Sequence, residues 1–277
     1  MVRLSSIKQW SAVIVVVAAF FVVCPVAAQE RVATKPMAVA NPHPLDPVLK
    51  IAQEGLDRVR TEVKDYSAVL IRRERIKGKL GEYIYMDVKI RNRVVTDGKT
   101  EVPFAVILNF LKPASLKGRE VVWVEGKNNG KMWVQESPLL GLKIPPVWLL
   151  PTGSLAMAEN KYPITDIGLE NLLVKLMDKG TIDRNRNRPE DCEVKILKGA
   201  KIEDRACTMI TLRHIVQKPE YEFERAEIFM DDELKVPIRY AAFLFPETKG
   251  GETPLDEEYT YTKLNLNIGL TDKDFTR

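Results

Sequence analysis

The pattern of apolar and polar positions between residues 66 and 124 predicts a run of extended segments with only turns between them. These segments are 66–76, 82–94, 102–111 and 119–124. The second segment alternates between apolar and polar positions, which is the pattern of a half-buried strand. Its apolar positions are Ile84, Met86, Val88 and Ile90. Consecutive strands joined by short links predict an antiparallel meander.

The third segment differs from the second because it is apolar on both faces. One face carries Phe104, Val106, Leu108 and Phe110, and the other carries Ala105, Ile107 and Leu111. Both faces of this strand therefore need apolar cover. We expect helices to cover one side of a curved sheet, and we expect part of the apolar surface to be kept for a ligand.

Two amphipathic helices are predicted on either side of the meander. The first spans residues 47–63 with Asp46 as its N-cap, and its apolar positions recur at steps of three and four. The second spans residues 166–179, is capped by Thr165 and ends at Gly180. Further strand-like runs lie at 193–197, 202–210, 221–229, 236–245 and 257–270. These elements predict an α+β fold in which the helices cover the concave face of a single curved antiparallel sheet of roughly ten strands.

Residues 138–163 combine prolines with an unusual number of apolar side chains. The prolines exclude a continuous helix or a central strand. The apolar residues are Leu139, Leu140, Leu142, Ile144, Val147, Trp148, Leu149 and Leu150. An ordinary solvated loop does not carry so many, so this segment either plugs the domain or gates an apolar cavity.

The apolar surface that helices and loop leave to a ligand is the candidate binding site. An apolar pocket of this kind suits acyl chains or hydrophobic peptide segments. The alternative is that the same side chains simply pack against the helices. The candidate residues are Phe104, Val106, Leu108, Phe110, Trp123, Trp133 and Trp148.

The N-terminus has the layout of a secretory signal peptide, with a basic start and an apolar run at residues 12–23. A membrane span needs about 20 apolar residues, and Pro25 interrupts the run before that length. We therefore expect cleavage after Ala28 rather than an uncleaved anchor. Residues 29–44 then predict a flexible tether, and residues 45–277 predict a single domain in the periplasm or cell envelope.

The charge balance argues against nucleic acid as a partner. Cleavage would remove Arg3 and Lys8 from the 42 basic residues and none of the 38 acidic ones, which leaves a net charge of +2. Binding to nucleic acid usually requires a clear excess of positive charge on one face.

Cys192 and Cys207 are predicted to form a structural disulfide. Export favours pairing, and strand-like runs flank Gly199 and Ala200. Glycine suits the first central position of a type II′ hairpin turn. A turn centred on this dipeptide sets the two cysteines opposite each other, within disulfide reach.

The residues that carry catalysis in other proteins are scarce. The two histidines, His43 and His214, stand at no ligand spacing, and the chain has neither a nucleophile elbow nor a glycine-rich phosphate loop. We expect no metal and no cofactor. Acidic residues remain at Asp256, Glu257 and Glu258. Paired carboxylates serve glycoside hydrolysis when they face each other across a cleft, but adjacent acids before a strand usually keep it soluble.

Three separated stretches resemble the exported bacterial family known as domain of unknown function 1571. They are residues 66–80, 110–120 and 162–172, and the similarity covers most of the mature chain. More distantly, one helix, a long meander and a closing run at 263–275 are similar to the LolA-like periplasmic lipoprotein carriers and the RseB-type envelope stress sensors. This resemblance implies a half-open β-barrel whose apolar inner face is covered by helices. It implies no particular ligand residue.

Together these features predict a non-enzymatic cell-envelope protein that binds a lipid or a lipoprotein acyl chain on the concave face of its sheet, in peripheral contact with a membrane. Two alternatives stay open. One is an envelope sensing or protein-interaction module, and the other is a carboxylate-based hydrolase that uses Asp256 or Glu257.

Overall fold

The computed structural model describes residues 42–138, 142, 144–186, 188–248 and 250–277. Residues 42–277 form one compact unit. The predicted leader and residues 29–41 of the predicted tether lie outside the described residues, as do Leu139 and Leu140. Among the helices that are described, none is long and apolar enough to span a membrane.

Twelve strands form one antiparallel sheet, in the order β10-β11-β12-β13-β14-β1-β3-β6-β7-β8-β9, with β2 paired to β1. Their bounds are β1 (Asp65–Ile76), β2 (Lys79–Leu80), β3 (Ile84–Arg91), β6 (Ala105–Lys112), β7 (Glu120–Val124), β8 (Met132–Gln135), β9 (Val147–Leu149), β10 (Cys192–Ile202), β11 (Arg205–His214), β12 (Arg225–Asp231), β13 (Pro237–Phe243) and β14 (Leu255–Leu266). A separate small hairpin consists of β4 (Val94–Thr96) and β5 (Lys99–Val102). The large sheet is not closed, because β9 and β10 are its edges.

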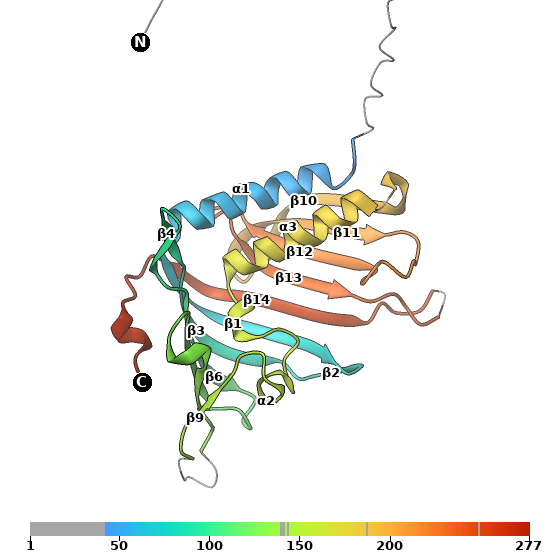
Figure 1. Ribbon diagram of the computed structural model, residues 1–277. Coiled ribbons are helices and arrows are strands. Elements are labelled where there is room, and N and C mark those ends of the chain that lie inside the picture. The colour runs from blue at the N-terminus through green and yellow to red at the C-terminus, as the bar shows by residue number, and fades with distance from the viewer. Residues whose placement is uncertain (1–41, 139–141, 143, 187, 249) are drawn as a thin grey trace, which may run out of the picture. The chain divides into compact units, whose positions relative to one another are not determined.

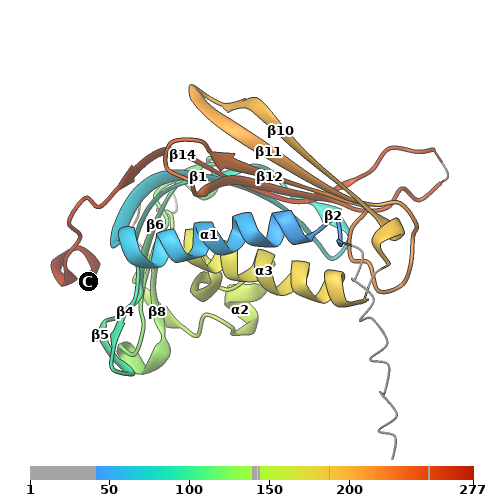
Figure 2. The same ribbon diagram turned by 90° about the horizontal axis from the view of Figure 1, so that it is seen from above.

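The sheet curves around three helices, which lie on its concave side (Figures 1 and 2). These are α1 (Asp46–Glu62), the short α2 (Ser154–Met157) and α3 (Leu169–Arg186). Figure 2 shows α1 and α3 next to each other inside the curve. The predicted α+β class, with a single curved antiparallel sheet and helices on its concave face, is confirmed.

The two strand patterns that led to this prediction are present in the structure. In β3, Met86, Val88 and Ile90 are buried toward the helices, while Asp87 and Lys89 are exposed. In β6, both faces are buried from Ala105 to Leu108, as predicted, but Leu111 at the end of the strand is exposed. The outer face is covered by the short C-terminal 3-10 helix η4 (Asp272–Phe275) and not by an α-helix. Phe275 packs there against Ala105, Ile107 and Val122.

Helix α1 begins one residue earlier than predicted. Asp46 is the first helical residue, and Leu45 occupies the N-cap position without a side-chain cap. The Asp46 carboxylate instead accepts a hydrogen bond from the backbone N–H of His43, at 3.0 Å, and so holds the turn that leads into the helix.

The predicted limits of the second helix are wrong at both ends. Residues 164–166 form a 3-10 turn, and α3 starts only after Gly168, whose φ of +112° breaks the helical path. The helix also runs through Gly180 instead of ending there. A Cβ atom at Gly180 would lie 2.9 Å from Cδ2 of Leu49 on α1. This glycine therefore allows two helices to approach each other and is not a C-terminal cap.

The predicted disulfide is also wrong, because the hairpin turns at a different place. The strands β10 and β11 pair Ile202 with Arg205, so the turn lies at residues 203–204. Gly199, with a φ of +82°, lies at a bulge within β10 instead. Cys192 therefore faces His214 and Cys207 faces Ala200. The two thiols are separated by roughly 25 Å along the strand, and both are free and buried.

The helix contact at Gly180 predicts a stability effect. Gly180→Leu should lower the free energy of unfolding by about 1–3 kcal/mol, because the new side chain overpacks against Leu49. Thr181→Leu is the matched control, since Thr181 is exposed on the same helix. Urea denaturation of both variants tests this, and equal midpoints would contradict a close helix approach.

The cysteine environments predict slow alkylation of the folded protein. Burial, and then the charges of Asp183 and Asp191, raise the pKa of Cys192 to about 11. Burial likewise raises the pKa of Cys207. At about pH 8 both thiols should react slowly in the folded state and quickly in urea, because the thiolate is the reactive form. Peptide mapping without a reductant measures both rates, and a Cys192–Cys207 linked peptide would refute the free-thiol assignment.

Candidate functional site

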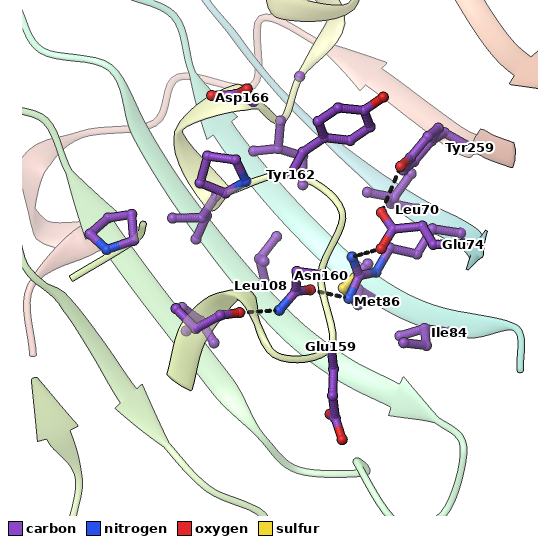
Figure 3. A pocket seen from close by; sticks show the side chains of 18 of the residues that line it. Leu70, Glu74, Ile84, Met86, Leu108, Glu159, Asn160, Tyr162, Asp166 and Tyr259 are labelled. Atoms are coloured by element: carbon purple, nitrogen blue, oxygen red, sulfur yellow. Dashed lines mark hydrogen bonds and ion pairs between the residues drawn. The ribbon is translucent and has the colours of Figure 1, made fainter. Parts of the chain in front are cut away.

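A cavity of about 370 Å³ lies between the concave face of the sheet and the segments that cover it. The strands contribute an apolar floor, part of which Figure 3 shows. The floor residues are Leu70 of β1, Ile84 and Met86 of β3, Leu108 and Phe110 of β6, Val121 of β7, Met132 and Val134 of β8, and Leu149 of β9. Each faces inward because side chains alternate between the two faces of a strand.

The cover consists of α2, α3 and the segment between them. We call residues 158–168 the strap. Its residues Asn160, Tyr162 and Ile164 line the cavity, as do Leu172 and Leu176 of α3. The strap runs over the sheet in Figure 3, so the cavity is lined by segments that are far apart in the sequence.

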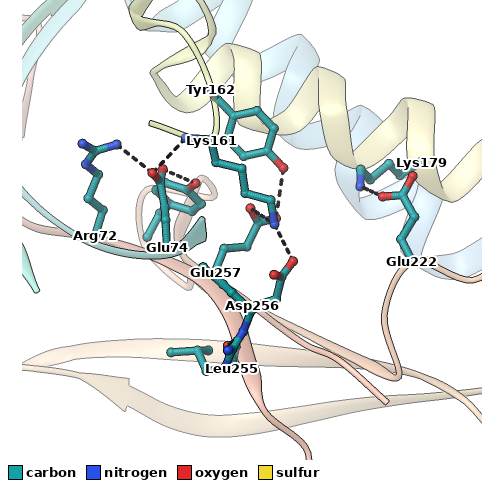
Figure 4. A network of polar contacts seen from close by, with 11 residues as sticks. Arg72, Glu74, Lys161, Tyr162, Lys179, Glu222, Leu255, Asp256 and Glu257 are labelled. Carbon is teal, nitrogen blue, oxygen red and sulfur yellow. Dashed lines mark hydrogen bonds and ion pairs between the residues drawn. The ribbon is translucent and has the colours of Figure 1, made fainter. Parts of the chain in front are cut away.

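One wall of the cavity is polar and begins at the end of β1. Glu74 is buried, and its carboxylate accepts three hydrogen bonds (Figure 4). The donors are Arg72 Nη1 at 3.0 Å, the hydroxyl of Tyr259 at 2.6 Å and the backbone N–H of Lys161 at 3.1 Å. Arg72 also donates through Nη2 to Oδ1 of Asn160. Two residues of one strand thus hold the strap through Asn160 and Lys161.

The polar wall continues behind the cavity lining, around the Lys161 ammonium, and of the residues there Tyr162 and Glu257 line the cavity. Lys161 Nζ forms ion pairs with Asp256 and, at 2.9 Å, with Oε2 of Glu257. The hydroxyl of Tyr162 donates to Oε1 of Glu257 at 3.1 Å. Burial lowers the pKa of Lys161, but the nearby carboxylates outweigh it, so that the pKa lies above its ordinary value. Lys161 is therefore charged and ties the strap to β14.

The structure brings only two of the seven predicted binding residues to the cavity. Leu108 and Phe110 line it. Phe104, Val106 and Trp123 are buried in the core beside it, where the rings of Phe104 and Trp123 lie 6.0 Å apart. Four of these five residues come from the predicted segment 102–111, which is apolar on both faces, and Trp123 comes from the neighbouring strand β7. The contact of Leu108 and Phe110 with a ligand stays a prediction.

The other two predicted tryptophans do not line the cavity. Trp133 is half-buried and packs against the outer cluster around Phe275. Trp148 is exposed on the edge strand β9. The segment 138–163 contributes Leu149, Pro151 and Leu155 to the cavity wall. It also exposes apolar side chains, at Leu142, Ile144, Val147, Trp148, Leu150 and Leu155.

Sequence reasoning missed the polar wall, although β1 carries a signal for it. Arg72 and Glu74 follow Leu70 at steps of two, so they lie on the inner face of the strand. On β14 the same spacing places Glu257, Tyr259 and Tyr261 on one face. Charged residues in phase with an apolar inner face indicate a polar site within the core.

The acidic residues considered for hydrolysis are all engaged in ion pairs. Asp256 and Glu257 pair with Lys161. Glu258 accepts a hydrogen bond from Arg239 Nη2 at 2.8 Å. This arrangement anchors the strap and β14 and assigns none of the three carboxylates to a reacting group. Within the described residues, no group of three or more metal-ligating side chains is clustered.

Two buried tyrosines hold the N-terminus of α3, next to the strap. The backbone N–H of Leu169 donates to the hydroxyl of Tyr66 at 2.8 Å, and that of Gly168 donates to the hydroxyl of Tyr261 at 3.2 Å. These bonds satisfy amides that the helix itself leaves unpaired. Burial raises the pKa of both tyrosines, that of Tyr66 well above its ordinary value.

The tyrosine contacts predict a loss of stability at high pH. The folded protein keeps its phenols neutral above pH 10, while the unfolded chain releases protons near its ordinary tyrosine pKa of about 10. The free energy of unfolding should therefore be unaffected below that pH and fall as the pH rises beyond it. Tyr66→Phe should make this fall shallower and also cost about 1–3 kcal/mol at neutral pH, because it leaves the Leu169 amide unpaired.

Tyr85→Phe is the matched control, because Tyr85 lies on the outer face of β3, with the Lys112 ammonium 5.2 Å from its ring centroid. Thermal or urea unfolding at a series of pH values measures both effects. If Tyr66→Phe and Tyr85→Phe follow the same curve, Tyr66 does not anchor α3.

Comparisons with solved structures find similar folds at low identity. A protein of the DUF1329 family from Desulfovibrio piger is 14% identical, with 85% of this chain and 98% of that chain covered and a TM-score of 0.37. The lipoprotein LppX from Mycobacterium tuberculosis is 15% identical over 82% of this chain and 100% of that chain, with a TM-score of 0.41. A LolA superfamily protein from Nitrosomonas europaea is 13% identical over 82% and 97%, with a TM-score of 0.31.

The sequence itself gives a more specific assignment. No curated protein matches it. A family model described as protein of unknown function (DUF1571) matches residues 63–277, which include the whole sheet, the strap and α3. The chain therefore belongs to the DUF1571 family.

Proposed function

We propose that this chain is a non-enzymatic cell-envelope protein that holds the apolar part of a lipid, or of a lipoprotein acyl chain, in the cavity on the concave face of its sheet. The observation that carries this proposal is the cavity of about 370 Å³ with an apolar floor drawn from six strands. Its volume falls within the range of about 300–1,000 Å³ that is usual for small-molecule pockets.

The chemistry of the floor favours an acyl chain over a polar substrate. Met86, Leu108 and Phe110 offer no hydrogen bond to a ligand. The favourable free energy of binding at these side chains would come from burial of the ligand's CH₂ groups. Each buried CH₂ contributes about 0.8 kcal/mol, so an acyl chain that places about five of them in the cavity gains roughly 4 kcal/mol before the costs of association. The polar wall at Arg72 and Glu74 would then face the end of the ligand that is not a hydrocarbon.

Two further features support a place in the envelope. The predicted cleavage after Ala28 and the tether at 29–44 would deliver the domain of residues 45–277 to the periplasm or cell envelope. The exposed side chain of Leu155 lines the cavity, and Trp148 and Leu150 are exposed on and next to β9, the edge strand that contributes Leu149 to the cavity wall. A membrane surface would cover such a set of apolar side chains, and a lipid could then pass between the bilayer and the cavity.

The exposed apolar side chains also support the second candidate, an envelope sensing or protein-interaction module. In that case a protein partner would cover Trp148 and Leu150. Crosslinking in cells separates the two proposals, because a module of this kind yields one stable protein adduct through position 148, whereas a lipid-binding protein yields co-purified lipid.

A cavity-filling substitution tests the proposed site directly. Met86→Trp adds bulk to the cavity floor and should lower the affinity for acyl chains by about tenfold or more, because several CH₂ contacts are displaced. Tyr85→Trp is the control, since it lies next in the chain but on the opposite face of β3. Organic extraction and native mass spectrometry of the purified proteins measure the lipid load, and circular dichroism confirms that both variants are folded.

The expected result is lipid on the unmodified protein and on Tyr85→Trp and little on Met86→Trp. An equal load on both variants would place the lipid outside the cavity. Absence of acyl-chain binding by the unmodified protein would refute the proposed function.

A further inference from the structure

The polar wall of the cavity is completed by groups of the strap rather than by the sheet. Asn160 supplies an amide oxygen to Arg72, and Lys161 supplies an N–H to Glu74. The Lys161 ammonium neutralises Asp256 and Glu257. The sheet therefore presents a buried surface that is complementary to an ammonium and to a hydrogen-bonding group, and the strap of the same chain occupies it (Figure 4).

Even with the strap in place, one buried atom of this wall, Nε of Arg72, has no hydrogen-bond partner within the described residues. A buried donor without a partner carries a cost of desolvation. The Glu257 side chain is only 4% exposed, and its Oε2 is paired with the Lys161 ammonium at 2.9 Å. Arg72 and Glu257 both line the cavity, one as a cationic donor and the other as an anionic acceptor that depends on Lys161.

We infer that this wall is the headgroup site for a zwitterionic aminophospholipid whose ammonium replaces that of Lys161. This inference rests on the proposed function, because it assigns the polar end of the same cavity. The ligand ammonium would donate to Oε2 of Glu257 and to Asp256, and its phosphate oxygen would accept from Nε of Arg72. The acyl chain would lie on the floor formed by Met86 and Leu108.

The charges around the site favour a zwitterion over an anion. The wall contains Glu74, Asp256 and Glu257 against Arg72 and Lys161. The ligand ammonium takes over the charge of Lys161 at Asp256 and Glu257, and the ligand phosphate adds one negative charge, which faces Arg72. An anionic headgroup would bring the same phosphate but no cation in place of Lys161, so displacement of that lysine would leave three carboxylates with Arg72 as their partner, which is unfavourable in a partly buried site. A choline headgroup carries the positive charge but has no N–H to donate.

The Lys161 ammonium can move from the wall into solvent at a low free-energy cost. Its side chain is 27% exposed at the edge of the wall, and it is long enough to turn into solvent. The cavity volume of about 370 Å³ suits a ligand with one acyl chain. A single-chain aminophospholipid is therefore the appropriate probe.

The test compares three lysophospholipids of the same chain length, with ethanolamine, choline or glycerol headgroups, each below its critical micelle concentration. Isothermal titration calorimetry on the whole mature protein gives the three affinities. The ethanolamine lipid should bind about tenfold more tightly than either of the others, as expected for one additional charge-assisted hydrogen bond.

Two variants locate this preference. Glu257→Gln should remove it while binding of the glycerol lipid is retained. Lys161→Met should strengthen binding of the ethanolamine lipid by about tenfold, because the competing ammonium is gone. Lys179→Met is the control, because it removes the same charge from a cavity-lining position whose ion pair is with the exposed Glu222. If Glu257→Gln does not fold, Lys161→Met alone decides.

The outcomes separate this inference from the proposed function. Equal affinities for all three lipids, or no difference between Lys161→Met and Lys179→Met, would overturn the headgroup assignment and leave acyl-chain binding intact. Failure of every lipid to bind would refute the proposed function itself, and the headgroup assignment with it. Binding of soluble phosphoethanolamine as tightly as of its lysolipid would show that a free polar amine, and not a lipid, is the ligand.

Discussion

The pairing of β1 with β14 is the constraint on which the cavity and its polar wall depend. One strand follows the first helix and the other comes near the end of the chain, and their antiparallel ladder joins two runs of strands into one sheet. The same ladder sets Arg72 opposite Tyr259 and Glu74 opposite Glu257. The sheet residues at the centre of the polar wall therefore all come from this one pair of strands.

This register has an electrostatic cost that a purely structural sheet would avoid. Two carboxylates directly opposite each other repel, and Glu74 and Glu257 are both buried. Arg72 compensates for one of them from the same strand, whereas the other depends on Lys161 of the strap. The strap thus covers the cavity and neutralises its wall at the same time. Removal of the strap from the sheet would therefore leave the buried Glu257 carboxylate without its cation.

The parts of this architecture that depend on local patterns could be predicted from the sequence. The alternation in β3 and the double-faced pattern of β6 are properties of neighbouring residues, and both appear in the structure. The failures have a common cause in tertiary contacts. Glycine is common just after a helix end, which is why Gly180 was predicted to end the helix. It lies within the helix because Leu49 approaches too closely for a larger side chain. Nothing adjacent to Gly180 in the sequence reveals that approach.

The turn of the cysteine hairpin was predicted wrongly, and the polar wall was missed, for related reasons. Two turns four residues apart satisfy the same local rules, and a bulge at Gly199 accommodates the one that the chain adopts. The partners of Glu74 are 87 and 185 residues away, at Lys161 and Tyr259. Arg72 and Glu74 were visible as inward charges on a strand, but their meaning depends on those distant partners. A single sequence shows such charges and leaves what they contact undetermined.

The cavity itself is more than a consequence of imperfect packing. Protein interiors are close-packed, and a void costs stability because the atoms around it lose contacts. A small residue, Ala156, is buried on the cover side, opposite the large side chains of the floor. A larger residue at position 156 would fill part of the void. A chain selected for stability alone would gain from such a change, so a small residue above an apolar floor and beside buried charges supports the proposed binding site.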